Sequence, residues 1–164
     1  MATEGNAKTS ASPSARLAQM GLTLPSAAQP SFNYVPVAVE RGIAYVSGQL
    51  PKVNGEVRLQ GRLGEGISME QGKEAARICG IQGLACLAEA LGSIDRVARI
   101  LRVSGFVSSA PGFFHQPAVI DAVSELMVEV FGEAGRHARS AIGVAALPRN
   151  APVEVELIAS VRED

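Results

Sequence analysis

Apolar and polar residues alternate near the carboxyl end of the chain, where the residues of one set are Val153, Val155, Leu157, Ala159 and Val161. Glu154, Glu156, Ile158 and Ser160 lie between them. A period of two is typical of a β-strand with two different faces. An apolar run over 141–147 comes before it, and Pro148, Asn150 and Pro152 separate the two. Because these residues favour turns, the pattern predicts two neighbouring strands joined by a short loop. Arg139 would open the first strand and Glu154 the second.

Three further segments have the β-rich composition of strands. The runs 34–40 and 43–47 are separated by Arg41 and Gly42, which predicts a hairpin. Residues 97–107 alternate Leu101, Val103, Gly105 and Val107 with Arg102, Ser104 and Phe106 and predict a third strand. Residues 51–67 are expected to form a loop, since their glycines fit neither a dinucleotide-binding nor a P-loop spacing.

Two segments have the period of amphipathic helices. The first begins at Ser68, where Ser68 and Gln71 form a capping-box pattern, and it ends at Gly92. The second runs over about 117–131 and ends at Gly132. The order of elements is strand, strand, helix, strand, helix, strand, strand. It predicts an α+β protein in which two helices cover one face of a mostly antiparallel or mixed sheet.

The amino-terminal part of the chain has a different composition. Residues 1–12 are small and polar, and we expect disorder there. The following segment predicts one or two helical turns, capped by Ser14 and ended by Gly21. The 164 residues are therefore interpreted as an extension over 1–30, partly disordered with a short helix, followed by one domain over 31–164.

Composition narrows the classes of function. The net charge is −1, and only 4% of the residues are aromatic, so a nucleic-acid surface is not indicated. The chain has no apolar run of membrane-spanning length and no signal-peptide pattern at its start, so we expect a cytoplasmic location. His115 and His137 lack the accompanying ligands of a metal site. Cys79 and Cys86 are roughly 10 Å apart along one predicted helix, which is too far for a disulfide and indicates buried apolar residues.

Two motifs resemble a known family. One is Ala138-Arg139-Ser140, an apolar strand, Leu147-Pro148-Arg149-Asn150 and an alternating Val-Glu-Val-Glu strand. The other is the segment Tyr45-Val46-Ser47-Gly48-Gln49-Leu50-Pro51. In this order, over roughly 32–162, they resemble the Rid/YjgF family of reactive-intermediate deaminases, whose members also carry the names endoribonuclease L-PSP and translation inhibitor.

The resemblance implies a chorismate-mutase-like fold and a homotrimer with active sites in the clefts between subunits. It implies hydrolysis of 2-imino or 2-enamino acids to 2-keto acids and ammonia, without a cofactor or a metal. Arg139 matches the arginine that binds the substrate carboxylate, and Glu154 matches the glutamate near the hydrolytic water. Tyr34, Ser47 and Gly48 match residues that line the pocket or touch the substrate.

Simpler interpretations stand beside these roles. Arg139 alone fits a surface arginine at the start of a strand, and Glu154 shares its strand face with Glu156, as two solvated carboxylates would. Tyr34 fits a half-buried strand aromatic, and His137 fits a loop residue that points to solvent.

The sequence also departs from the family pattern. Ala141 replaces the usual cysteine and Gly143 an acidic residue, while Asp121 lies near, but not at, the spacing of the family's helical asparagine. A trimer that binds a small carboxylate without turnover is therefore the alternative function, and an endoribonuclease is less favoured.

Overall fold

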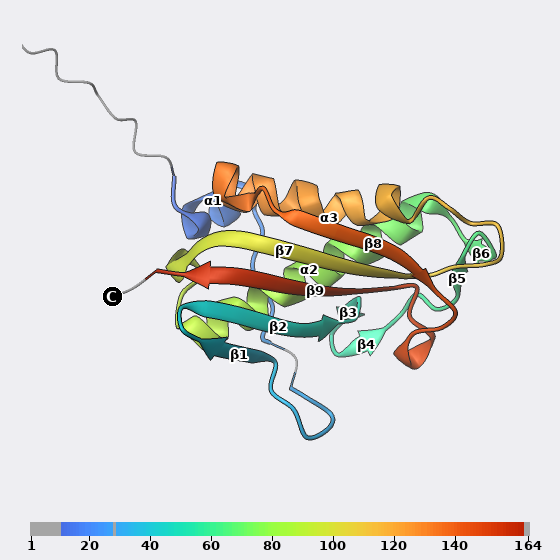
Figure 1. The fold of residues 1–164 in the computed structure, drawn as a ribbon, viewed down its shortest axis with the longest axis horizontal. Coiled ribbons are helices and arrows are strands. Elements are labelled where there is room, and N and C mark those ends of the chain that lie inside the picture. Colours follow the sequence, from blue (N-terminus) through green and yellow to red (C-terminus); the bar gives the residue numbers. More distant parts are fainter. Residues whose placement is uncertain (1–10, 28, 163–164) are drawn as a thin grey trace, which may run out of the picture.

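The structure is a computed structural model that describes residues 11–27 and 29–162. Its centre is a five-stranded sheet of β1 (Val37–Glu40), β2 (Ile43–Gln49), β7 (Val97–Ser108), β8 (Ala138–Val144) and β9 (Val153–Val161). The strand order is β1-β2-β9-β7-β8 (Figure 1). β8 runs parallel to β7, and the other neighbours are antiparallel. The predicted mixed sheet is confirmed.

The predicted pairing of the last two strands is wrong. β7 lies between β8 and β9 and pairs with both of them. The connection from β8 therefore crosses the end of β7, passing through the short 3-10 turn η3 (Pro148–Asn150) before β9 begins. Turn residues between two strands show where the chain changes direction, but they do not show that the strands are neighbours.

The hairpin of β1 and β2 follows from its turn. Arg41 and Gly42 both have positive φ, 49° and 72°, which is the backbone of the two-residue turns that suit the twist of antiparallel strands. The first strand is shorter than predicted, since it begins at Val37 and leaves Tyr34 in the loop before it.

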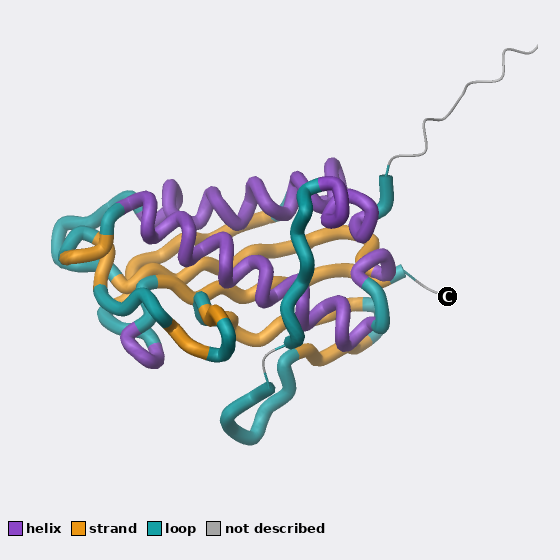
Figure 2. The backbone as a smooth tube through the Cα atoms, turned by 180° about the vertical axis from the view of Figure 1, so that it is seen from behind, coloured by secondary structure: helices purple, strands orange, loops and turns teal. Residues whose placement is uncertain are grey.

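Two long helices, α2 (Met69–Leu91) and α3 (Gln116–Phe131), cover one face of the sheet (Figure 2). Ser68 and Gln71 form both hydrogen bonds of the predicted capping box, and Gly92 ends α2 with a left-handed φ of 78°. The apolar stripe of α3 is buried as predicted, and Cys79 and Cys86 are buried within α2. None of the helices within the described ranges is long and apolar enough to cross a membrane.

A short helix, α1 (Pro13–Gln19), packs beside the carboxyl end of α3 and the 3-10 turn η1 (Ile94–Arg96). Its cap is Ser12, whose hydroxyl accepts from the Ala15 amide, and not Ser14 as predicted. The disorder expected over 1–12 falls mainly on residues 1–10, which lie outside the described residues.

The predicted loop over 51–67 contains four short strands. β3 (Lys52–Val53) and β4 (Glu56–Val57) form a hairpin whose turn, Asn54-Gly55, has φ values of 55° and 82°. β5 (Arg62–Leu63) and β6 (Gly66–Ile67) form a second small pair. Leu63 is fully buried. The segment is therefore a folded flap on the domain, and the dipeptide Asn54-Gly55 was the sequence signal for it.

The two faces of the main sheet differ in burial. On β9, Val153, Val155 and Leu157 point into the helix-side core, and Glu154 and Glu156 point to the other side. We call that other side the open face. It is turned toward the viewer in Figure 1, with both long helices behind or above it.

Candidate functional site

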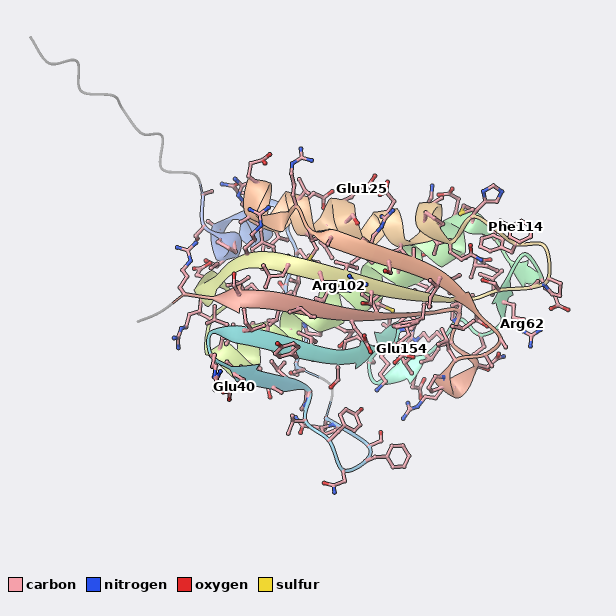
Figure 3. All side chains as sticks on the ribbon, in the orientation of Figure 1. Glu40, Arg62, Arg102, Phe114, Glu125 and Glu154 are labelled. Atoms are coloured by element: carbon pink, nitrogen blue, oxygen red, sulfur yellow. The ribbon has the colours of Figure 1, made fainter. Side chains whose placement is uncertain are left out.

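A hollow lies at the end of the open face where β2 approaches β3. Its volume is about 510 Å³, which is within the range of small-molecule sites. We call it the Glu154 hollow, since Glu154 is its one acidic lining residue among those described, and Figure 3 labels that side chain beside the tip of β2. Tyr34, Ser47 and Gly48 also line it. Four of the five residues predicted from sequence are therefore adjacent in the fold.

Gly48 leaves the space that the Glu154 carboxyl group occupies. A Cβ atom at Gly48 would overlap Oε1 of Glu154 and lie 2.9 Å from its Cδ. The pairing of β2 with β9 shifts register at this point, between Val46 and Gln49, so the backbone near Gly48 leaves the regular ladder. This irregularity and the missing side chain together allow a carboxyl group to lie directly against the backbone of β2.

The environment of Glu154 favours its protonated form. The side chain is half-buried, and this loss of water raises the pKa of its carboxyl group. The nearby carboxylate of Glu156 raises the pKa of Glu154 further, because two like charges on one strand face repel each other. A raised pKa makes the ionised carboxyl group a stronger proton acceptor, and the protonated group can return the proton later in a reaction.

Ser47 fixes the loop that carries Tyr34. Its hydroxyl donates to the Val35 carbonyl at 2.8 Å, and its amide donates to the Pro36 carbonyl at 2.9 Å. Tyr34 is 50% exposed and borders the hollow. The strand environment considered for Tyr34 is wrong, and the pocket-lining position that the resemblance implied matches its location.

Lys52 and Arg149 place positive charge around the same hollow. Arg149 has a φ of 56° and is followed by Asn150 with a φ of 54°. The hydrogen bond from the Gly61 amide to the Asn150 carbonyl, 2.9 Å long, holds this turn. Left-handed backbone at two consecutive residues other than glycine is uncommon, and such residues gather at functional sites.

Arg139 lies elsewhere, on β8 at the edge of the sheet. Its Nη1 donates to Oδ1 of Asp121 at 3.0 Å and to Oγ of Ser124 at 3.1 Å, and both partners are on α3. The side chain is 26% exposed, and Asp121 is 59% exposed. Arg139 is therefore a half-buried, oriented guanidinium and not a freely moving surface arginine.

His137 belongs to the same cluster, so the interpretation of a residue that points to solvent is wrong. Its Nε2 lies 3.0 Å from Oγ of Ser124, and its Nδ1 lies 2.6 Å from the Gly135 carbonyl. Partial burial lowers the pKa of the imidazole, the hydrogen bond to Gly135 opposes this, and the positive charge of Arg139 lowers the pKa further. The ring is therefore neutral at pH 7.

The space beside Gly143 is filled from α3 and from the loop before it. A Cβ atom at Gly143 would lie 2.8 Å from Nε2 of Gln116 and 3.1 Å from Oγ of Ser109. Gln116 donates to the Ser109 hydroxyl at 3.2 Å and to the Phe113 carbonyl at 2.7 Å. Neutral polar groups therefore stand where the family pattern places an acidic side chain.

The structure does not bring Arg139 and Glu154 together within one chain. Arg139 pairs with Val103, which is fully buried, and contacts α3, so it lies on the helix side of the sheet. Glu154 points to the open face. The partners of Arg139 were missed from sequence, because Asp121 and Ser124 meet it only through the packing of α3 on β8.

Comparison with known proteins agrees with the fold. Residues 14–161 match the model of the family described as "YjgF/chorismate_mutase-like, putative endoribonuclease". The curated protein TCP17 from Trypanosoma cruzi is 43% identical over 145 residues, which cover 88% of this chain and 91% of TCP17.

Solved structures give the same result. Atu1372 from Agrobacterium tumefaciens, a protein of unknown function, has 40% identity and a TM-score of 0.83, covering 90% of this chain and 91% of its own. A "putative endoribonuclease" from Shewanella oneidensis has 32% identity and a TM-score of 0.88, covering 92% and 100%. TdcF from E. coli with bound serine shares the fold at 23% identity and a TM-score of 0.57, covering 85% and 93%. The chain belongs to the YjgF/Rid family.

Proposed function

We propose that this protein is a homotrimer that hydrolyses 2-imino acids, and their 2-enamino tautomers, to 2-keto acids and ammonia in clefts between subunits. The observation that carries the proposal is that two functional groups, one cationic and one acidic, lie at separate positions on a single chain. The chain presents an oriented guanidinium at one sheet edge and a carboxyl group with a raised pKa on the open face. Each is half of a site for a reactive carboxylic acid, and a neighbouring subunit supplies the missing half.

The open face supports the assembly. Tyr45 is 48% exposed and Ile142 is 49% exposed, and both project from strands of the sheet on the side away from the helices. A shallow groove beside Tyr45 also includes Arg102 and Glu156, which lie on the same face. Apolar side chains with polar groups between them are typical of a surface that another subunit covers.

The reaction needs orientation more than a strong nucleophile. Arg139 pairs with the substrate carboxylate through donors that Asp121 and Ser124 leave unused, because both of these bind Nη1 and the guanidinium carries five N–H groups. The imine carbon then lies near Glu154. Its carboxylate takes a proton from a water molecule as the water oxygen bonds to that carbon, and it passes this proton to the imine nitrogen, which gives a neutral carbinolamine.

The resulting carbinolamine collapses to the products. The Glu154 carboxylate takes the proton of the hydroxyl group and passes it to the amino nitrogen, so that the oxygen forms the keto group as the carbon–nitrogen bond breaks and the nitrogen leaves as ammonia. The enzyme group is unchanged at the end of the cycle. The imine is reactive by itself, so positioning and a preorganised charge account for the acceleration.

A coupled assay tests the proposal. A dehydratase generates 2-aminoacrylate or 2-iminobutyrate, and formation of keto acid and ammonia is followed with and without the protein. We expect acceleration by the wild type and a loss of at least about 10²-fold in kcat/KM for Arg139→Ala, because the carboxylate loses a charged pair. Arg62→Ala, which removes an exposed arginine on β5, is the matched control and should retain activity. No acceleration by the wild type on any imine would refute the deaminase.

A carboxylate-binding protein without turnover is the second candidate. The neutral groups Gln116 and Ser109 beside Gly143, and the carboxylate of Asp121 on Arg139, favour it because they reduce the charge available for catalysis. Saturable binding of a 2-keto acid with no ammonia from any imine would establish this function. The ribonuclease activity in the names of relatives predicts RNA affinity that falls steeply with salt, and the net charge of −1 does not favour it.

A further inference from the structure

Ser124 and His137 form a chain of hydrogen bonds that ends on Arg139. Asp121 and Ser124 are one helical turn apart on α3, and both accept from Nη1 of Arg139. Ser124 in turn meets Nε2 of His137 at 3.0 Å. Neither Ser124 nor His137 lines the Glu154 hollow, and His137 has no role in the mechanism above.

The direction of every bond in this chain follows from its last member. The Gly135 carbonyl can only accept, so Nδ1 of His137 carries the hydrogen of the 2.6 Å bond. In a neutral ring Nε2 is then an acceptor, and the Ser124 hydroxyl donates to it. The lone pairs of Ser124 remain for Arg139. The hydrogen bonds therefore run in one direction: Arg139 donates to Ser124, Ser124 donates to His137, and His137 donates to the Gly135 carbonyl.

Gly135, the last member of this series of hydrogen bonds, is held firmly against α3. Gly135 is buried, and a Cβ atom there would lie 2.8 Å from the Val128 amide nitrogen and closer still to the Met127 carbonyl group. Glycine therefore allows the backbone at residue 135 to lie directly against α3. The carbonyl that orients His137 is fixed to the same helix that carries Asp121 and Ser124.

We propose that Ser124 and His137 are positioning residues for Arg139, holding its Nη1 so that Nε and Nη2 face the carboxylate of the substrate. This inference rests on the proposed function of Arg139. Asp121 alone binds Nη1 at one point and leaves the guanidinium plane free to rotate. A second bond to Ser124 defines that plane, and the neutral His137 ring fixes the Ser124 hydroxyl. These hydrogen bonds thus hold the guanidinium group of Arg139 in one orientation, in which it can bind a carboxylate with two parallel hydrogen bonds.

Protonation of His137 would break this series of hydrogen bonds. Nε2 would then carry a hydrogen, so the Ser124 hydroxyl would lose its acceptor, and a second positive charge would stand beside Arg139. The elements packed around His137 carry these charged residues: Arg139 on β8, Asp121, Glu125 and Glu129 on α3, Glu133 on η2 (Gly132–Gly135), Arg136 directly after η2, and Arg99 and Arg102 on β7. Affinity for the carboxylate is therefore expected to be full above the pKa of His137 and to fall below it.

Steady-state kinetics on 2-iminobutyrate test the positioning role. We expect Ser124→Ala and His137→Ala to raise KM about five- to tenfold at pH 8, with kcat within about twofold, because a weakened anchor affects binding first. His137→Gln should restore most of the affinity that His137→Ala loses, since its amide oxygen can accept from Ser124 without titrating, and it should abolish the rise in KM at acid pH. Glu125→Ala, on the same helix outside the chain of bonds, is the matched control.

A second measurement separates this inference from the proposed function. The pKa of His137, followed by NMR, should rise in Ser124→Ala and in Arg139→Met, whether or not the protein turns over any imine. Should the wild type prove inactive, Kd for 2-ketobutyrate replaces KM, and the same order of variants is expected. An unchanged His137 pKa in Arg139→Met, or an unchanged affinity in both alanine variants, would overturn the positioning role.

Discussion

At the scale of one residue, Glu154 shows how a half-buried carboxylate lowers the stability of the folded protein. Its carboxyl group is half-buried against Gly48 and near the charge of Glu156, and both effects raise the pKa of the carboxyl group in the folded protein. A raised carboxyl pKa means that the folded state holds the proton more tightly than the unfolded state. The contribution to stability is therefore full below the unfolded pKa and is lost as the pH rises through the folded pKa.

Replacing Glu154 should therefore stabilise the protein while removing its activity. For Glu154→Gln we expect a Tm above that of the wild type near pH 8, a difference that shrinks toward about pH 4 as the wild-type carboxyl group becomes protonated. Loss of the proton acceptor should lower kcat about 10²-fold. Thermal unfolding of both proteins across this pH range measures the difference. A Tm difference that grows toward acid pH would contradict the raised pKa.

The same scale shows what the sequence could reveal about the site. The period of two along β9 correctly placed Glu154 and Glu156 on one face, because parity on a strand is a local property. The contact of Arg139 with Asp121 is not local, since the two residues are joined only when α3 packs beside β8. The position of His137 depends in the same way on the close approach of Gly135 to α3.

At the scale of elements, hydrophobic period predicted what each segment is but not where it lies. The strands over 97–107 and 153–161 and both long helices are confirmed, because burial of one face determines their pattern. The order of strands is decided by the parallel pairing of β7 with β8, which turn residues do not encode. The missed hairpin of β3 and β4 is too short for a visible period.

The first helix offers a prediction about an element. Asp95 accepts from the Ser14 amide at 2.8 Å and from its hydroxyl at 2.6 Å, and Leu17 is buried in the core. Farther along, the Ala27 amide donates to Glu89 of α2 at 3.3 Å. Residues 11–27 are thus attached to the helical layer, and they lead to the loop that carries Tyr34.

Asp95→Ala should loosen this attachment without unfolding the domain. We expect a local cost of about 1–2 kcal/mol, because two hydrogen bonds to a carboxylate are lost, and hence faster amide exchange in α1 than in the wild type. Exchange in β7 and β9 should be unchanged. Asp95→Asn, which keeps one acceptor oxygen, should lie between the two. Equal exchange of α1 in all three proteins would show that packing of the helix, including that of Leu17, holds it without Asp95.

At the scale of the whole molecule, a single chain leaves the sheet half covered. The helices bury one face, whereas the open face presents Tyr45 and Ile142 to solvent and also carries the Glu154 hollow. Sequence patterning predicted the covered face, because its apolar residues are periodic. The proposed use of the open face rests on contacts between chains, and no pattern within one chain specifies such contacts.

Mixed trimers test whether Arg139 and Glu154 act across subunits. Arg139→Ala and Glu154→Gln are each expected to be inactive alone, since each lacks one half of every site. When the two are co-expressed, a cleft is intact only where a Glu154→Gln chain supplies Arg139 and an Arg139→Ala chain supplies Glu154. Every mixed trimer has one such cleft among its three, so the purified mixed trimers should recover about a third of the wild-type activity. Two affinity tags purified in sequence ensure that both chains are present. Each chain in these trimers lacks either Arg139 or Glu154, so a site built from one chain alone would never be complete. Mixed trimers that remain inactive would therefore place the reaction within a single subunit or exclude it.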